Sequence, residues 1–576
     1  MVAFPITSGR MRQWAIASVS ALLLAGLSAC GGSSTPAAAS GVLNIGLAAQ
    51  GSPNWWPPIS PATACGTLTG GGEQAAFMYM PLLWINRTDQ ISYPKSIASA
   101  IAVNKSDTVF TIDMKSNWQW SNGEPVTAQN VLFDWSLIKA ASSSTSPLPY
   151  CFAGGGGVPN GWRSVTAPNA HTVVVTTKTS VNPVWFEHNA LAQLVPVPRV
   201  WQKYSNMNRE LAWIQSIGST PNNPVYKVVD GPYTISKAVP DQYWTYVANP
   251  KFSGVDKPSI KTVTYHYETS SSNLFAQLHR GTLDVAPLPL SLYNQRGQLT
   301  SYHVVTQQLF AFFYMTLNFR SNANGIGGLF NQLYIRQALQ MGIDQPAIIA
   351  SIYHGLAEPT VGPVPRYPKN AYFDSAIKGY PYSPQQGKAL LEKYGWHMTN
   401  GVMTRNGQKL EFPLLFATGS TSRTNMMQLI KQAWAQEGIV VNLQTMAPSA
   451  VGPLVGRVAN SSKWAVDGNG GWIYVPDYYP TGGELFLPSA GFNRGAYYSS
   501  TMNTLIQQTY AGGTAAQIKQ RFNAYQAYTA EQLPGLWMPT PESIAEVRNG
   551  VHGMSANYNP IIALTPLNEV SLGSKS

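Results

Sequence analysis

A short segment near residue 475 holds the densest group of residues able to contact a solute. Residues 471–480 read Gly-Trp-Ile-Tyr-Val-Pro-Asp-Tyr-Tyr-Pro. Its aromatic members are Trp472, Tyr474, Tyr478 and Tyr479. Aromatic side chains stack on ligands but also fill protein cores, so we expect some of the four to form a stacking wall and the rest to pack internally. Asp477 either contacts the ligand or, since it follows a proline, serves as a helix cap or turn residue.

A second group of aromatic and polar residues lies in a loop after the first apolar run of the chain. Trp55 and Trp56 stand between Pro53 and two further prolines, which hold such a loop rigid. Gln50 and Asn54 lie beside them and could supply polar contacts to the same ligand.

Signatures of catalysis are missing from the sequence. It holds no His-Glu-x-x-His motif, no His pair with metal-ligand spacing and no Gly-x-Ser-x-Gly elbow. The four glycines of residues 154–157 lack the Lys-Ser/Thr that follows in a phosphate-binding loop. We therefore expect no enzymatic reaction, no metal site and no cofactor.

Composition points to a soluble body of two or three domains. The 576 residues exceed one ordinary domain, and 44% of them are apolar. Charged residues make up only 11%, and the net charge is +11. Lys and Arg are scattered, without the basic runs typical of nucleic-acid binding. The composition therefore favours a protein that works near anionic polymers of the cell envelope, and we expect no nucleic-acid partner.

The N-terminal residues predict export and a lipid anchor. Arg10 and Arg12 precede a short, largely apolar stretch, as in a signal peptide. The sequence Leu-Ser-Ala-Cys that ends at Cys30 resembles the bacterial lipobox. We expect a signal peptide over residues 1–29, lipidation of Cys30 and a flexible tether over residues 30–40.

Two further cysteines, Cys65 and Cys151, lie in loops rich in Gly, Pro and Ser. An oxidising compartment outside the membrane makes a disulfide between them plausible. Their geometry decides whether the bond forms, and the sequence does not give that geometry.

Hydrophobic periodicity predicts alternating strands and helices. Residues 110–114 alternate apolar and polar side chains, as in a half-buried strand, and Thr127 suits the N-cap of the helix that follows. Residues 412–417 and 439–443 read as strands on either side of a helix over residues 424–436. A strand-helix-strand unit of this kind predicts a parallel crossover in an α/β layer.

Four segments, taken in order, resemble the extracellular solute-binding proteins of ABC transporters, in particular the peptide/nickel group known as family 5. The first runs from Tyr-Pro-Lys-Ser-Ile-Ala at residue 93 to the Trp, Gly-x-Pro turn and Thr-Ala helix start of residues 118–131. The second is Gly-Pro-Tyr at residue 231 with Asn-Pro-Lys-Phe at residue 249. The third covers residues 278–286, and the fourth covers residues 317–349.

This resemblance implies a two-lobed α/β periplasmic-binding-protein fold (type II, cluster C-like) with an extra subdomain inserted in lobe I. The core of lobe I would comprise residues 41–75, 227–309 and 531–576. The inserted subdomain would span residues 76–226, and lobe II residues 310–530. The chain would cross between the lobes near residues 308–312 and 532–538, and hinge closure would bury the ligand.

The resemblance also assigns the ligand site. The aromatic segment at residue 475 matches a family segment that lines the cleft and usually reads Trp-x-x-Asp, with the Asp pairing the α-ammonium of a peptide. Val475 stands at that Asp position here, so either Asp477 substitutes for it or the ligand has no free amine there. Trp55 and Trp56 match a loop that reaches the cleft, and Trp537 matches an aromatic position in it.

The function implied is capture of an oligopeptide or peptide-like solute outside the cytoplasm and its delivery to ABC permease subunits, by a monomer anchored to the cell membrane. Because of Val475 and the abundance of aromatic residues, two alternatives stay open. One is a binding protein for a sugar, a metal chelate or an envelope glycan. The other is an envelope or signalling protein that kept the fold without transport.

Overall fold

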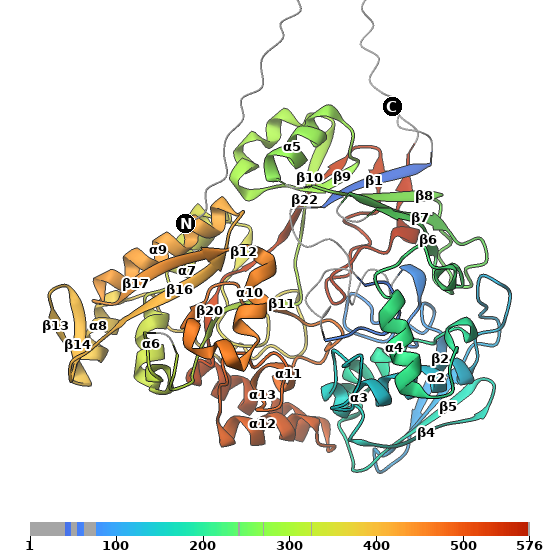
Figure 1. The fold of residues 1–576 in the computed structure, drawn as a ribbon, viewed down its shortest axis with the longest axis horizontal. Coiled ribbons are helices and arrows are strands. Elements are labelled where there is room, and N and C mark those ends of the chain that lie inside the picture. The colour runs from blue at the N-terminus through green and yellow to red at the C-terminus, as the bar shows by residue number, and fades with distance from the viewer. Residues whose placement is uncertain are drawn as a thin grey trace, which may run out of the picture. The chain divides into compact units, whose positions relative to one another are not determined.

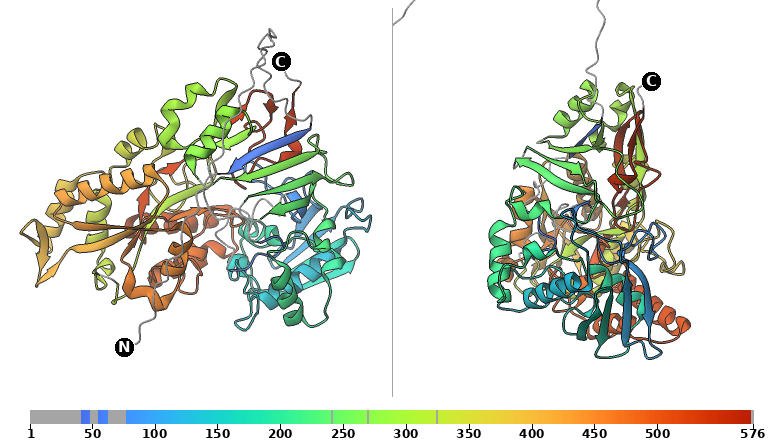
Figure 2. Two further views of the ribbon diagram at one scale, coloured as in Figure 1. Left: turned by 45° about the horizontal axis from the view of Figure 1, so that its top comes forward. Right: turned by 90° about the vertical axis from the view of Figure 1, so that its right-hand side faces the viewer.

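A seven-stranded sheet is the first of three larger sheets, each in its own part of the molecule, and has the strand order β10-β22-β9-β1-β8-β7-β6 (Figure 1). Its strands are β1 (Val42–Leu47), β6 (Tyr233–Val239), β7 (Tyr243–Ala248), β8 (Thr262–Tyr267), β9 (Val285–Pro287), β10 (Tyr302–Gln307) and β22 (Ser543–Arg548). The computed structural model describes residues 41–47, 55–62, 77–239, 242–268, 270–323 and 325–573. β1, drawn in blue, runs parallel to β8 beside it (Figure 2). We call this sheet and helix α5 (Ser271–Arg280) the first lobe.

A four-stranded antiparallel sheet is the second of the larger sheets, and together with its helices we call it the subdomain. Its strand order is β2 (Ala98–Val103), β3 (Val109–Met114), β5 (Thr172–Thr177) and β4 (Trp162–Asn169). The helices of the subdomain are α2 (Ala128–Ala141), α3 (Pro183–Asn189) and α4 (Met207–Ile217). The predicted strand is confirmed, because Phe110, Ile112 and Met114 are buried. Thr127 is the N-cap of α2, and its backbone N–H donates to Asn130 at 2.8 Å.

A six-stranded sheet forms the core of the second lobe. Its strands are β11 (Ala311–Leu317), β16 (Glu411–Ala417), β17 (Val440–Met446), β18 (Val466–Asp467), β19 (Gly471–Ile473) and β20 (Gly535–Met538). Its helices are α6 (Leu333–Met341), α7 (Gln345–Ser351), α8 (Pro384–Lys393), α9 (Thr421–Gln436), α10 (Pro448–Val455), α11 (Gly483–Phe486), α12 (Ser500–Tyr510) and α13 (Ala515–Gln532). β16 and β17 pair in parallel with α9 between them, so the predicted crossover is confirmed.

Short strand pairs complete the described structure. They are β12 (Ala357–Glu358) with β21 (Thr540–Pro541), β13 (His397–Thr399) with β14 (Val402–Arg405) and β15 (Gln408–Lys409), and β23 (Val551–His552) with β24 (Ser571–Leu572). Across the described ranges, no helix has the length and apolar character needed to span a bilayer.

The chain passes between the two larger sheets twice, at neighbouring points. In the first lobe β10 pairs with β22, and Gln307 lies opposite Ser543. In the second lobe β11 pairs with β20, and Phe313 lies opposite Met538. The crossings are therefore residues 308–310 and 539–542. The second lies after the predicted stretch of 532–538, because residues 535–538 form β20 of the second sheet. The predicted domain boundaries otherwise stay a prediction.

Candidate functional site

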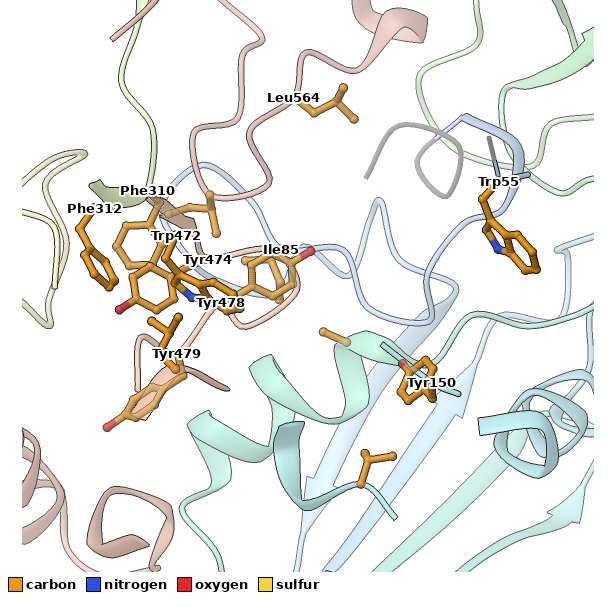
Figure 3. Packing of buried hydrophobic residues seen from close by; sticks show 14 of the residues in the cluster. Trp55, Ile85, Tyr150, Phe310, Phe312, Trp472, Tyr474, Tyr478, Tyr479 and Leu564 are labelled. Atoms are coloured by element: carbon orange, nitrogen blue, oxygen red, sulfur yellow. The ribbon is translucent and has the colours of Figure 1, made fainter. Parts of the chain in front are cut away.

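The aromatic segment is positioned by pairing of β19 with the start of β11, so that Trp472 lies opposite Phe312. The ring of Tyr474 lies 5.3 Å from that of Phe310 and 5.9 Å from that of Phe312, and the Tyr474 hydroxyl donates to the carbonyl of Pro363 at 2.6 Å. Figure 3 shows these rings gathered together. Tyr474 is fully buried, whereas Trp472 keeps 8% exposure and its indole N–H has no hydrogen-bond partner among the described residues.

Trp537 joins the same aromatic group from β20. Its ring lies 5.7 Å from that of Phe312, edge to face. The side chain of Gln340 holds the Trp537 backbone on both sides, accepting from its N–H at 2.6 Å and donating to its carbonyl at 3.1 Å. The structure thus brings Trp472, Tyr474 and Trp537 together at β11. A contact of any of them with a solute stays a prediction.

Trp55 and Trp56 are buried where the subdomain meets the first lobe, and Figure 3 shows Trp55 apart from the rings of the β11 group. The Trp55 indole donates to the carbonyl of Ile59 at 2.7 Å, and its ring lies so close to Gly218 that a Cβ there would come within 2.1 Å. The Trp56 ring meets that of Trp244 edge to face at 6.2 Å. Gln50 and Asn54 lie outside the described residues, and the roles predicted for all four stay predictions.

Asn189 of the subdomain reaches into the aromatic segment of the second lobe. Its side-chain amide donates to the Asp477 carboxylate and to the carbonyl of Tyr479, the latter at 2.8 Å. Its side-chain oxygen accepts from the Tyr479 backbone N–H at 2.7 Å. Asp477 is therefore tied to another part of the chain, and it caps no helix. Its second oxygen is buried without a partner among the described residues.

Further contacts join the same two parts of the molecule beside Asn189. Asn182 donates to the carbonyls of Tyr510 and Thr509 at 2.7 and 3.2 Å, from its backbone and its side chain respectively. The rings of Trp185 and Tyr510 stack at 4.3 Å with an angle of 18°. We call this contact of residues 181–189 with residues 477–479 and 509–511 the seam. It holds the subdomain against the second lobe.

A buried His–Asp pair lies at one end of the seam. The ring nitrogens of His188 lie 2.9 and 3.1 Å from the carbonyl oxygens of Val184 and Asp89. The Asp89 carboxylate lies 3.7 Å from the same ring. Burial raises the pKa of Asp89 to about 6, an effect that His188 opposes, and Tyr372 and Tyr478 of the second lobe face this carboxylate.

A second acidic group lies where the subdomain covers α11. Burial raises the pKa of Glu484. Burial also raises the pKa of Asp477, and the nearby negative charge of Glu484 raises it further. Burial also raises the pKa of Asp134 well above its usual value, although its carboxylate accepts from the Val195 N–H at 2.9 Å. Tyr150 lies near Asp134 and Glu484 and donates to Gln193 at 3.0 Å. Such a group can hold protons or positive charge.

The described part of the chain contains no group of three His, Cys, Asp or Glu residues placed to hold a metal ion. Cys151 is disulfide-bonded. Cys65 and Cys30 lie outside the described residues, so the pairing of Cys65 with Cys151 and the lipidation of Cys30 stay predictions.

Asn189, Asn182 and Glu484 were not among the predicted site residues. Asn182 precedes Pro183 and accepts from the Val184 N–H at 3.2 Å, which is a helix-start signal visible in the sequence. Nothing local marks Asn189 or Glu484, because their partners lie far away in the chain.

Comparison with known proteins identifies the architecture. The sequence model of "Bacterial extracellular solute-binding proteins, family 5 Middle" matches residues 93–483. The oligopeptide-binding protein AppA of Bacillus subtilis (strain 168) is 23% identical over 481 residues, which cover 80% of this chain and 82% of AppA.

Solved structures agree with this match. The AppA structure from Bacillus subtilis, in complex with a nonapeptide, is similar with a TM-score of 0.75 at 19% identity over 93% of this chain and 99% of that chain. NikZ from Campylobacter jejuni, in complex with Ni(L-His), gives 0.74 at 17% over 93% and 100%. The periplasmic EDTA-binding protein EppA gives 0.75 at 14% over 92% and 97%. The predicted two-lobed α/β fold is thereby confirmed.

Proposed function

The chain belongs to the bacterial extracellular solute-binding proteins of family 5, and from this premise we propose that it captures an oligopeptide or peptide-like solute and delivers it to the permease of an ABC importer. The observation that carries the proposal is the likeness to AppA along 93% of the chain, since the AppA structure holds a nonapeptide. Capture needs no chemistry from this chain, and we assign it no enzymatic reaction. The aromatic group at β11 would supply apolar contacts to the solute.

A non-peptide solute, such as a metal chelate, is the second candidate. Val475 offers no charge for a peptide α-ammonium, and one oxygen of Asp477 already accepts from Asn189. A buried ammonium without a free carboxylate is costly to desolvate. NikZ and EppA, which share the fold, are described with a nickel–histidine complex and with EDTA.

Native mass spectrometry of the full chain, purified without denaturant, tests both candidates. We expect additional masses that fragment into amino-acid ladders. A sugar or chelate mass in their place would contradict the peptide assignment. If the protein is recovered empty, thermal unfolding with peptide, chelate and sugar panels decides, because a solute at 100 times its Kd stabilises the protein by about 2.7 kcal/mol. No stabilisation by any class would contradict capture itself.

The setting of this function rests on the N-terminus. We propose that Cys30 is lipidated and anchors a monomer on the outer side of the cell membrane, close to its permease. Family membership supports the extracytoplasmic location, and the lipobox-like sequence supports the anchor.

A further inference from the structure

Two carboxyl groups, Asp477 in the seam and Glu484 beside it, are buried without a positive charge to offset them. Asp477 is 7% exposed and Glu484 9% exposed. One oxygen of Asp477 accepts from Asn189, and the other has no partner among the described residues. Within the described ranges, no lysine, arginine or histidine lies close enough to lower the pKa of either group. Two neighbouring buried carboxylates are unstable unless at least one of them is protonated.

The titratable groups that face this pair are phenols and one more acid. Tyr474, Tyr510 and Tyr525 surround Asp477 from its own segment, α12 and α13. Tyr150 faces Glu484 from the subdomain, and Asp134 lies beyond Tyr150. Phenols are neutral at ordinary pH, so none of these neighbours compensates the negative charge of the pair.

The pair owes its burial to the subdomain. Asn189 covers Asp477, and a Cβ on Gly155 would lie 2.9 Å from a Glu484 oxygen and 3.1 Å from the amide nitrogen of Gln193. All three covering residues come from the subdomain, whereas both acids belong to the second lobe. Separation of the two parts would return the carboxyls to water, where they ionise with ordinary pKa values.

We propose that closure of the seam takes up protons at Asp477 and Glu484, so that acidification closes the protein and alkalinisation opens it. The proposal rests on the lobe movement that the proposed function requires. Burial favours the neutral acids, so the closed form binds more protons than the open form. Proton uptake therefore favours closure fully at pH values below the ordinary carboxyl pKa. This contribution is lost as the pH rises through the raised carboxyl pKa values of the closed form. Each proton taken up changes the closed-to-open ratio by at most about tenfold per pH unit.

Small-angle X-ray scattering of the full, solute-free chain tests the proposal. We expect the radius of gyration to fall between about pH 8.5 and about pH 4.5, while far-UV circular dichroism shows an unchanged fold. Glu484→Gln and Asp477→Asn should each flatten this change and keep the protein closed at the higher pH, because an amide cannot ionise. If one variant fails to fold, the other serves alone.

Glu437→Gln is the matched control. Glu437 is also fully buried with a raised pKa, but it lies against Gly342 and Gly387 within the second lobe, so its substitution should leave the transition unchanged. A wild-type radius that does not change with pH overturns the proposal. So does an unchanged transition in the folded seam variants. Because no solute is present, these outcomes are independent of whether the protein captures peptides.

Discussion

Replacing Asn189 by alanine tests whether the seam controls closure. The substitution removes three hydrogen bonds between the subdomain and the second lobe, two to the backbone of Tyr479 and one to the Asp477 carboxylate. A net value of about 1 kcal/mol per hydrogen bond gives a loss of about 3 kcal/mol. That loss lowers the closed-to-open ratio by roughly a hundredfold.

The assay compares this variant with Asn318→Ala. Asn318 is also buried, and its side chain donates to Ser461 and Trp464 at 2.7 and 2.9 Å and accepts from the Arg320 N–H at 3.3 Å, all within the second lobe. Both substitutions should lower the stability to denaturant. Only Asn189→Ala should increase the radius of gyration near pH 6 and weaken solute affinity, because a solute that binds the closed form loses affinity as that form becomes rare.

Two results would refute this reasoning. One is an Asn189→Ala protein that scatters like the wild type and binds the solute found by mass spectrometry with unchanged affinity. The other is an Asn318→Ala protein that opens to the same extent, since the seam would then have no special part in closure.

Three further substitutions address the aromatic group at β11, the contact of Trp55 with the subdomain, and a buried acid. Trp472→Phe removes the unpartnered indole N–H and should weaken solute binding severalfold by calorimetry. Trp464→Phe is the control, because its side chain packs in a separate apolar cluster with Val451 and Val455, and it should leave the affinity unchanged. Equal affinities of the two variants would remove Trp472 from the site. Gly218→Ala should lower stability by about 1–3 kcal/mol in urea, because its Cβ would meet the Trp55 ring; an unchanged midpoint would contradict that packing. Burial raises the pKa of Glu437 to about 9, so folding binds a proton and wild-type stability should fall as the pH rises from about 5 to about 9. Glu437→Gln should lessen that fall, as measured by urea titrations at several pH values. Wild-type and variant stabilities that fall in parallel with pH would contradict this prediction.

Local features of the fold could be predicted from the sequence. Alternation at residues 110–114 and the cap at Thr127 depend on neighbours a few positions away, and both are confirmed. The helix over residues 421–436 between two parallel strands follows from the same kind of pattern. The sequence predicts the second crossing too early in the chain, because Gly535–Met538 is apolar enough for either sheet and only its pairing with β11 decides between them.

The candidate site was less predictable because its contacts are long-range. Asn189 and Asp477 lie 288 positions apart, and no periodicity connects them. The rigid, aromatic surroundings of Trp55 predict a ligand loop; its ring packs against Gly218, and its contact with a ligand stays a prediction. A tryptophan suits a ligand wall and a core equally well, so residue type alone does not distinguish the two.

The two crossings between the sheets have a mechanical consequence. Gln307 and Ser543 are paired at one end, and Phe313 and Met538 at the other, so the two short crossings are held together at both ends by the strands that flank them. Two short connections held at both ends favour a rotation of one lobe relative to the other over a sliding movement. A narrow crevice, lined by Gln308 and Thr540 among others, lies alongside the crossings. Bulky substitutions in this crevice would restrict the rotation of the lobes without changing either the aromatic group at β11 or the seam.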